Sequence, residues 1–272
     1  MEWNLPHTYD FDDRTIRYGV AGDGPALVIV HGTPWSSFNL RHLIKGLSDR
    51  YTVYYYDLMG YGQSDQQEGD VSLGVQNEIL HSLITKEWKL SSPIAIGHDF
   101  GGATVLRTHL LSGAEFEKMV LIDPVAVAPW GSEFFAHVRK HESAFSGVPD
   151  YIQDAILRAY ILSAAHEKLD EATLSETVRP WATGLGKAAF YRQIAQADQK
   201  YTDEVQALYS NIDLPVLILW GEEDVWIPIE RGLELQKAIP QSQFFAVPDA
   251  GHLVIEEKPQ ELLKRIIPFL AG

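Results

Sequence analysis

The sequence predicts an α/β protein in which helices flank a mostly parallel β-sheet and a helical segment interrupts it. Three observations predict this class. Short apolar runs alternate with amphipathic stretches in the first half of the chain, the alternation stops after Pro124, and it resumes near Leu214. Near-continuous apolar runs are typical of strands that are buried on both faces. Regular alternation of such strands with helices produces a parallel sheet covered by helices.

The core elements follow in order along the chain. Strands are expected over 26–32, 51–58, 92–98, 118–124 and 214–221 and within 242–252, where aliphatic and aromatic residues cluster. Helices are expected over 36–50, 73–88, 101–111, 228–239 and 258–272, where apolar residues recur with helical spacing. Ser36 or Ser37 can cap the first of these helices, because a serine hydroxyl accepts a hydrogen bond from a free helical N–H.

Between about residues 127 and 210 the sequence contains helical stretches and no convincing strand. These stretches cover 132–145, 151–169, 171–184 and 186–211. We therefore divide the chain into a core domain, residues 1–126 and 211–272, and a helical cap, residues 127–210. Ligands of open α/β sheets bind at the carboxyl ends of the strands. Since the insertion leaves and re-enters the sheet at strand ends, it is placed to act as a lid.

The composition excludes several classes of protein. The chain has 272 residues, a net charge of −15 and no cysteine, which excludes disulfides, thiolate metal sites and cysteine nucleophiles. An acidic surface repels phosphates and anionic lipid, so we expect neither a nucleic-acid nor a membrane partner. No metal-binding spacing such as H-E-x-x-H occurs, and we expect no metal ion and no cofactor. The N-terminal stretch MEWNLPHTYDFDD has no signal-peptide pattern, which favours a cytoplasmic protein. We expect a monomer or a homodimer.

Four polar fragments follow expected strands. The first, Gly97-His98-Asp99-Phe100-Gly101, has the outline of a G-x-S-x-G turn in which aspartate replaces the nucleophilic serine. The others are His31-Gly32-Thr33-Pro34, Gly221-Glu222-Glu223-Asp224 and Gly251-His252. Because the carboxyl ends of parallel strands meet at one edge of a sheet, these fragments are expected to converge. Asp99, Asp224 and His252 occur in the order nucleophile, acid, histidine.

On these fragments the chain resembles the enzymes of the α/β-hydrolase fold over nearly its whole length. The aspartate at the nucleophile turn is similar to that of the branch containing epoxide hydrolases and haloalkane dehalogenases. The resemblance implies that Asp99 attacks carbon and forms an alkyl ester. His252, oriented by Asp224, would then activate the water that hydrolyses this ester. The backbone N–H groups of Thr33 and Phe100 would hold the oxyanion that forms on Asp99.

Two carboxylates have alternative interpretations. Asp99 precedes the helix expected over 101–111 and could simply cap it, which is a common role of aspartate. Asp123 ends the strand expected over 118–124 and rivals Asp224, because some dehalogenases of this branch place their acid just after that strand. We favour Asp224, since the segment GEEDVWIP matches the commoner acid loop. We favour catalysis for Asp99 because an acid and a histidine follow it in order.

The groups that would hold the leaving atom favour an epoxide over a halide. Haloalkane dehalogenases usually hold halide between an indole N–H just after the nucleophile and a second donor, but Phe100 and Thr33 stand at these two positions. Epoxide hydrolases protonate the epoxide oxygen with phenols of the cap, and Tyr191 resembles one of these. His141 and Tyr151 are the candidates for the second donor.

We therefore predict an epoxide hydrolase that converts a small, largely apolar organic substrate into a vicinal diol. The alternative within the same mechanism is a haloalkane or haloacid dehalogenase, although Phe100 and Ala103 stand where fluoroacetate dehalogenases carry arginines. The alternative from another class is a non-catalytic small-ligand-binding protein on this fold. Trp130, Trp181 and Trp226 could line the pocket or donate an indole N–H.

Overall fold

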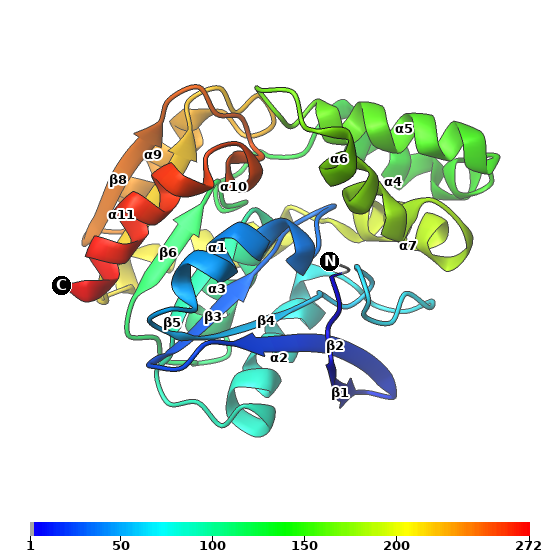
Figure 1. The fold of residues 1–272 in the computed structure, drawn as a ribbon. Helices are drawn as coiled ribbons and strands as arrows, with labels where there is room; N and C mark the ends of the chain where they lie inside the picture. The colour runs from blue at the N-terminus through cyan, green and yellow to red at the C-terminus, as the bar shows by residue number, and fades with distance from the viewer. Residues whose placement is uncertain (1–2) are drawn as a thin grey trace.

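The computed structural model describes residues 3–272, which form an eight-stranded sheet with a helical layer on each face (Figure 1). The strand order is β1-β2-β4-β3-β5-β6-β7-β8, in which β3 to β8 run parallel and β1 and β2 run antiparallel to their neighbours. The strands are β1 (His7–Phe11), β2 (Arg14–Ala21), β3 (Ala26–Val30), β4 (Thr52–Tyr56), β5 (Ile94–His98), β6 (Met119–Ile122), β7 (Val216–Gly221) and β8 (Ser242–Val247). The predicted fold class is confirmed.

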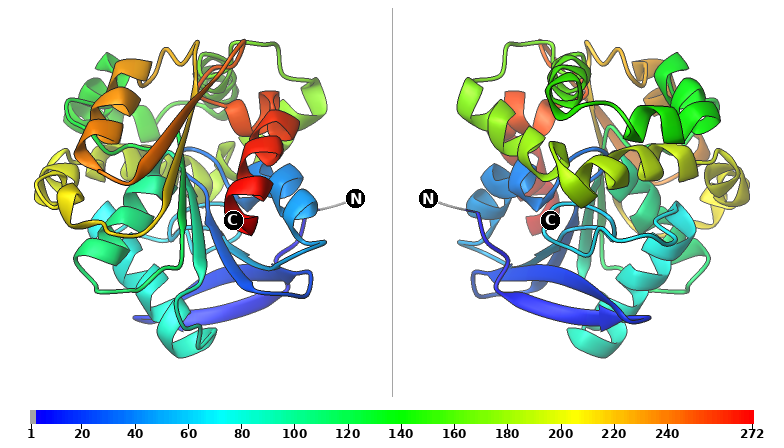
Figure 2. Two further views of the ribbon diagram at one scale, coloured as in Figure 1. Left: turned by 90° about the vertical axis from the view of Figure 1, so that its left-hand side faces the viewer. Right: turned by 90° about the vertical axis from the view of Figure 1, so that its right-hand side faces the viewer.

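The apolar runs form the central strands, as their composition predicts. Every residue of β5, β6 and β7 is buried, because helices cover both faces of the sheet there. Figure 2 shows α1 (Arg41–Leu47) and α11 (Pro259–Ala271) on one face, with α2 (Leu73–Ser82), α3 (Phe100–Leu110) and α9 (Ile229–Ala238) on the other. The short helix α10 (Val254–Glu257) follows the fragment that carries His252.

The sequence does not predict the two strands of the N-terminal hairpin, β1 and β2. The two strands join at Asp12 and Asp13, both of which have positive φ angles of 47° and 63°. Two consecutive positive φ angles are the mark of the two-residue turn that joins tight hairpins. Both strands are mixed in polarity, because β1 is the edge strand of the sheet and β2 pairs with it, so they lack the continuous apolar signal of the central strands.

Two predicted helices begin or end differently from the prediction. The helix expected over 36–50 starts as a 3-10 turn, Ser37–Leu40, before α1 begins at Arg41. The helix expected over 73–88 ends in a π-helical turn, Leu83–Glu87, that widens the end of α2. Neither difference changes where the strands that flank the site end.

Within the described residues, the segment between β6 and β7 contains helices and no strand. These helices are α4 (Glu133–Ser146), α5 (Asp150–Leu162), α6 (Glu171–Val178), α7 (Gly184–Gln196) and α8 (Lys200–Gln206), with single 3-10 turns at Arg179–Trp181 and Tyr209–Asn211. In Figure 1, α4 to α7 lie beyond the end of the sheet toward which the parallel strands point. They fall within the predicted cap, residues 127–210.

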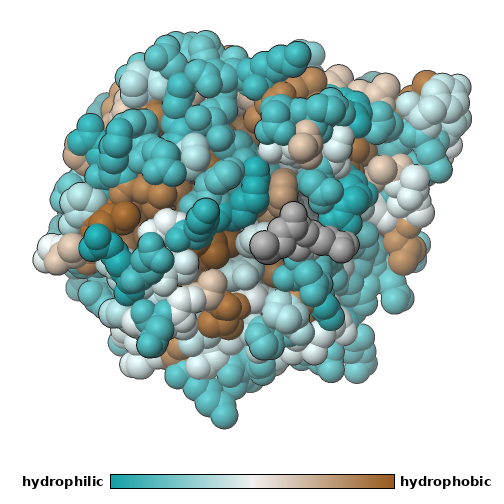
Figure 3. Space-filling view, viewed as in Figure 1, coloured by the Kyte–Doolittle hydropathy of each residue, from teal (hydrophilic) through white to brown (hydrophobic). Residues whose placement is uncertain are grey.

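The surface is mainly hydrophilic on the face drawn in Figure 3, where apolar residues form small separate areas. None of the helices formed by residues 3–272 combines the length and the apolar character needed to cross a membrane. The small apolar areas on the face drawn in Figure 3 are not the wide apolar surface that marks a stable docking site.

Candidate active site

Asp99 occupies a strained turn between β5 and α3. Its backbone angles are φ 54° and ψ −120°, which a residue with a side chain rarely adopts. The turn is tight because the chain crosses closely beside it: a Cβ atom at Gly101 would meet the carbonyl oxygens of Val30 and His31. Asp99 holds the N-cap position of α3, but its side chain makes no capping hydrogen bond. The carboxylate is therefore directed away from the helix that it precedes.

The structure brings Asp99, His252 and Asp224 together. Oδ2 of Asp99 lies 3.2 Å from Nε2 of His252, and Nδ1 of His252 lies 2.8 Å from Oδ2 of Asp224. The other oxygen of Asp224 accepts hydrogen bonds of 2.8 Å from the backbone N–H groups of Trp226 and Ile227. All three side chains are almost completely buried. Asp224 thus fixes the ring of His252 with its other nitrogen toward Asp99.

The charges beside His252 favour its protonated form. Burial alone lowers the pKa of the imidazole, but the adjacent carboxylates of Asp224 and Asp99 outweigh burial and raise the pKa well above its ordinary value. The raised pKa depends in part on Asp99. Any reaction that neutralises the Asp99 carboxylate therefore lowers the proton affinity of His252.

The expected oxyanion loop reaches Asp99 from the end of β3. The backbone N–H of Thr33 donates to Oδ1 of Asp99 at 2.5 Å. A Cβ atom at Gly32 would overlap the Asp99 carboxyl group, so only glycine fits before this donor. The second expected donor, the N–H of Phe100, is the first of α3, and the opening N–H groups of a helix have no acceptor within it.

A glutamine of the cap holds the oxyanion loop. Oε1 of Gln193, in α7, accepts hydrogen bonds from the hydroxyl groups of Thr33 at 2.6 Å and Tyr61 at 3.0 Å. Trp181 adds a second link, because its indole N–H donates to the carbonyl oxygen of Pro34 at 2.7 Å. The cap is thus fastened to the same loop that carries the Thr33 donor.

Asp123, the rival acid, lies beside the triad but does not bond to His252. Its Oδ1 accepts from the N–H of Gly221 at 2.9 Å, and its buried Oδ2 has no hydrogen-bond partner among residues 3–272. Burial and the charge of Asp224 raise the pKa of Asp123 well above its ordinary value. The raised pKa favours the protonated form of Asp123, and Asp224 is the acid that bonds to His252.

The buried histidines near the site have local partners. Nε2 of His98 pairs with the carbonyl oxygen of His252 at 2.9 Å, and burial lowers the pKa of His98 to about 4. His31 accepts from the N–H of Leu58 and pairs with the carbonyl oxygen of Gly32. Both rings are neutral and hold backbone segments in place.

The side chains of Asp123, Asp224 and His252 offer ligand atoms that lie within 4.8 Å of one another, a spacing that a metal ion could bridge. However, Nδ1 of His252 is hydrogen-bonded to Asp224 and its Nε2 faces Asp99. The ring therefore has no free nitrogen for a metal. The cluster fits a proton-transfer role better than a metal centre.

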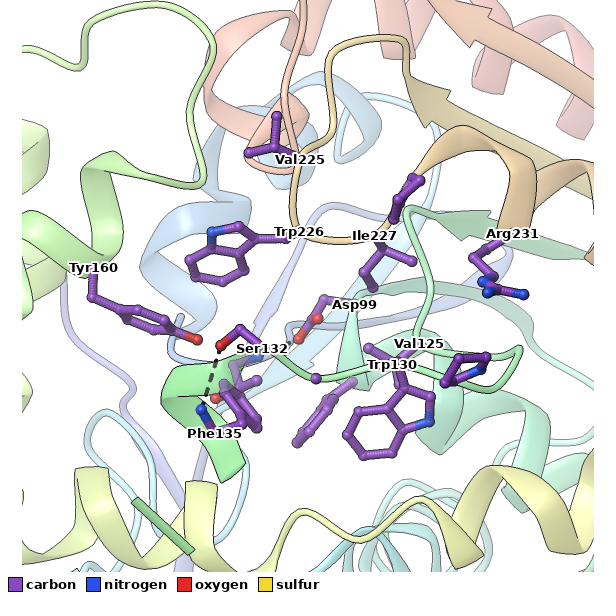
Figure 4. A pocket seen from close by; sticks show the side chains of 15 residues that line it. Asp99, Val125, Trp130, Ser132, Phe135, Tyr160, Val225, Trp226, Ile227 and Arg231 are labelled. Atoms are coloured by element: carbon purple, nitrogen blue, oxygen red, sulfur yellow. Dashed lines mark hydrogen bonds between the residues drawn. The ribbon is translucent and has the colours of Figure 1, made fainter. Parts of the chain in front are cut away.

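A cavity of about 430 Å³ opens above Asp99 between the core and the cap (Figure 4). Its polar and charged lining consists of Asp99, Thr33, Ser132, the Tyr160 hydroxyl and Arg231, and the last of these already pairs with Glu234. The remaining lining is largely apolar: Phe100, Val125, Pro129, Trp130, Gly131, Phe135, Val225, Trp226, Ile227 and Pro228. A volume and lining of this kind suit a small organic molecule.

None of the three predicted leaving-group donors lines this cavity. The Tyr191 hydroxyl is buried and bonds to Oε1 of Gln153 at 2.5 Å, and burial raises its pKa to about 12. Tyr151 is 75% exposed, and His141 also lies on the surface. The phenol that reaches the cavity is Tyr160, in α5.

Tyr160 was not singled out by the sequence because nothing in its helix distinguishes it from a packing residue. Its ring enters the cavity beside Trp226, and its hydroxyl points toward Ser132 and Asp99 (Figure 4). The Tyr160 hydroxyl makes no hydrogen bond to any of residues 3–272. It is also not sealed inside the protein, because Tyr160 lines the cavity. Burial, then the charge of Asp99, raises its pKa, so the phenol stays protonated. It is a phenolic donor that is free to bond a ligand in the cavity.

The indole groups considered as donors already have protein acceptors. The N–H of Trp130 donates to Oγ1 of Thr202 at 2.8 Å, and that of Trp226 donates to Oγ of Ser163 at 3.1 Å. The indole N–H of Trp181 is bonded to Pro34, as described above. The N–H of Trp35 has no partner among residues 3–272, but this ring is completely buried and does not line the cavity.

Known proteins resemble this chain over most of its length. A cis-3-alkyl-4-alkyloxetan-2-one decarboxylase of Xanthomonas campestris is 28% identical over 281 residues, which cover 91% of this chain and 89% of that protein. The solved structure of an α/β-hydrolase-fold protein from Burkholderia ambifaria is 45% identical, covers 98% of both chains and has a TM-score of 0.95. The structure of an epoxide hydrolase, 22% identical with a TM-score of 0.78, covers 97% of this chain and 98% of its own and shares the fold.

The strained turn after β5, the acid after β7 and the histidine after β8 thus lie together at one edge of a mostly parallel sheet. The family model described as the alpha/beta hydrolase family matches residues 27–265, which is most of the chain. The chain belongs to the alpha/beta hydrolase family.

Proposed function

We propose that this protein is a hydrolase in which the carboxylate of Asp99 attacks a carbon atom of an epoxide and forms an alkyl ester. One observation carries the proposal: the Asp99 carboxylate faces the cavity with Oδ1 on the Thr33 N–H and Oδ2 beside Nε2 of His252. A carboxylate needs no base to remove a proton before it attacks, whereas serine does. The substrate is small and largely apolar, in keeping with the lining of the cavity.

The same contact explains how His252 changes its role. In the free protein the Asp99 carboxylate helps to keep the imidazole protonated. Once Asp99 is esterified that negative charge is gone, the pKa of His252 falls, and the ring can release its proton and act as a base. It then takes a proton from water, the hydroxide attacks Cγ of Asp99, and the Thr33 and Phe100 N–H groups hold the oxyanion. As the oxyanion collapses, His252 gives the proton that it took from water to the departing alkoxide, and the diol leaves. Asp99 then releases the second proton of the water and its carboxylate returns.

Tyr160 is the proposed proton donor for the epoxide oxygen. As Asp99 forms its bond to carbon, the ring C–O bond breaks, and the oxygen takes the phenolic proton. We assign this role to Tyr160 and no longer to Tyr191, the residue that the sequence predicted. The Tyr160 hydroxyl is free and faces the cavity, whereas the Tyr191 hydroxyl is bonded to Gln153. The phenolate recovers its proton when the second step releases one from water.

Dehalogenation by the same mechanism is less well supported. A departing halide carries a full negative charge and needs N–H donors, but the indole groups of Trp130, Trp181 and Trp226 already donate to protein atoms. A phenol suits a departing alkoxide, because it transfers a proton that halide does not require. The donor set of the cavity therefore favours an epoxide.

A second candidate is the opening of a four-membered lactone. It is favoured by the Xanthomonas relative, whose name gives an oxetan-2-one substrate and a decarboxylation. Asp99 could attack the saturated ring carbon that is bonded to the ring oxygen. This attack breaks the bond between that carbon and the ring oxygen, and it frees the substrate's own carboxylate. Loss of carbon dioxide would form an alkene and expel the Asp99 carboxylate. No water is consumed, so an alkene separates this reaction from diol formation.

The mass of a trapped intermediate tests the proposal. His252→Gln should form the ester but not hydrolyse it, so the protein should gain the mass of one whole epoxide. A bromoalkane should add only its alkyl group, because bromide leaves. The double variant Asp99→Asn/His252→Gln is the matched control and should gain no mass. Recovery of unchanged ligand, with no adduct on His252→Gln and no turnover by wild type, would show a binding protein instead.

A further inference from the structure

Trp226 stacks on the ring of His252. The two ring centroids are 5.2 Å apart and the planes are inclined by 29°. The indole is also nearly parallel to the ring of Tyr160, with centroids 4.5 Å apart and the same inclination. Figure 4 shows the Tyr160 and Trp226 rings together at one side of the cavity above Asp99. One indole therefore contacts both the proposed base and the proposed proton donor.

Trp226 is held in this position from both the core and the cap. Its backbone N–H donates to Oδ1 of Asp224 at 2.8 Å, which ties it to the acid of the triad. Its indole N–H donates to Oγ of Ser163 at 3.1 Å, and Ser163 is the C-cap residue of α5. Because Tyr160 also belongs to α5, the cap fixes the orientation of the indole through two contacts.

The groups around His252 leave its ring face without an anionic partner. Asp224 lies at Nδ1 and Asp99 at Nε2, both in hydrogen-bond positions at the ring edge. The raised pKa of Asp123 favours its neutral form, and Asp123 makes no hydrogen bond to His252. His98, whose ring centroid is 5.3 Å away, has its pKa lowered to about 4, which favours its neutral form as well. When Asp99 is esterified, Asp224 is the remaining charge that stabilises a protonated ring. The π-electrons of an aromatic face attract a cation placed over it within about 6 Å.

We propose that Trp226 is a positioning residue whose indole stabilises the imidazolium form of His252 and that helix α5 holds the indole in place for this purpose. The proposal rests on the role of His252 as the base. The imidazolium forms when His252 takes a proton from water during ester hydrolysis. An indole that stabilises this cation strengthens the base and lowers the barrier of that step.

The direct test is the titration of His252 followed by NMR of imidazole-labelled protein, with its signal assigned by loss in His252→Gln. Trp226→Leu should lower the pKa of His252, because it removes the aromatic face. Trp226→Phe should lower it less, because phenyl is a weaker partner for a cation than indole. Ser163→Ala should produce a smaller shift in the same direction, because it releases the indole without removing it.

Trp130→Leu is the matched control, since Trp130 lines the same cavity but packs edge to face against Phe100, with centroids 5.7 Å apart. It should leave the titration of His252 unchanged. If the indole only keeps water away from His252, Trp226→Leu would expose the imidazole to water and raise the pKa of His252. That result would overturn the proposal. An unchanged pKa in both Trp226 variants would do the same. If Trp226→Leu does not fold, Trp226→Phe decides the outcome alone.

The titration does not depend on turnover, so it separates this proposal from the proposed function. A shift in the pKa of His252 without any epoxide turnover would support the stacking proposal and remove the epoxide hydrolase assignment. With turnover, the pH profile of kcat gives a second readout. In Trp226→Leu the acid limb of the kcat profile should move to lower pH and the plateau value of kcat should fall. If Trp226 had a purely structural role, the plateau value would fall but the acid limb would stay at the same pH.

Discussion

Oδ2 of Asp99 lies 3.2 Å from Nε2 of His252, and the Asp99 side chain makes no hydrogen bond to the helix that it precedes. These two facts together argue against a helix-capping role for the Asp99 side chain. A capping aspartate would direct its oxygen to the N–H groups of α3. Here both oxygens are directed elsewhere, one to His252 and the other to the Thr33 N–H.

Tyr160→Phe should slow the opening of an epoxide by about 100-fold or more, because it removes the general acid. Ester formation from a bromoalkane should change little, since bromide needs no proton. Tyr191→Phe is the matched control and should leave both substrates nearly unaffected, because its hydroxyl is bonded to Gln153. Single-turnover rates with both substrates check this. Equal slowing of the two substrates by Tyr160→Phe would remove its acid role.

Asp224→Asn should lower kcat on the order of 10⁴-fold, as expected when the carboxylate that orients a triad histidine becomes an amide. The charge of Asp224 raises the pKa of His252, so its loss should move the acid limb of the residual pH–rate profile to lower pH. The measurement is kcat against pH for wild type and variant. A limb that stays in place would show that Asp224 does not set the proton affinity of His252.

Asp123→Asn should be tolerated, with kcat reduced by less than about tenfold. Its Oδ1 accepts from Gly221, an acceptor that an amide oxygen can replace, and the side chain is already neutral. A loss as large as that of Asp224→Asn would instead assign the acid role to Asp123.

The stability of the same variant should depend on pH. Burial and the Asp224 charge raise the pKa of folded Asp123 above that of the unfolded chain. The stability that Asp123 contributes is therefore fully present below the unfolded pKa and is lost as pH rises toward the folded pKa. Asp123→Asn removes this loss, so the Tm of the variant relative to that of wild type should rise as the pH increases from about 4, the ordinary pKa of an aspartate, toward the raised pKa of folded Asp123. Thermal unfolding at several pH values checks this trend, and a constant difference would contradict it.

The sequence predicts the central sheet well because burial on both faces leaves a strong local signal. Runs such as ALVIV and VLILW are typical of strands that are buried on both faces, and β3 and β7 form there. The edge hairpin β1–β2 is missed because its strands alternate in polarity and lie at the margin of the sheet. The sequence is sufficient to identify Asp99, Asp224 and His252 as a group, because each of them follows the end of an expected strand.

The cap donor could not be predicted in the same way. Tyr160 and Tyr191 both lie in amphipathic helices, and sequence spacing does not tell which helix face meets the cavity. Packing decides it: α7 turns Tyr191 toward Gln153, whereas α5 places Tyr160 against Trp226. The role of Trp226 depends on contacts with residues far apart in the chain, so it also required the folded structure.

The most direct measurement is a single turnover of an epoxide in ¹⁸O-water with the enzyme in excess. If Asp99 forms the ester and water cuts it at Cγ, the first diol released should carry unlabelled oxygen from Asp99. The peptide that contains Asp99 should gain the label. Label in the first diol, with none in that peptide, would mean that water attacks the substrate directly and would contradict the account.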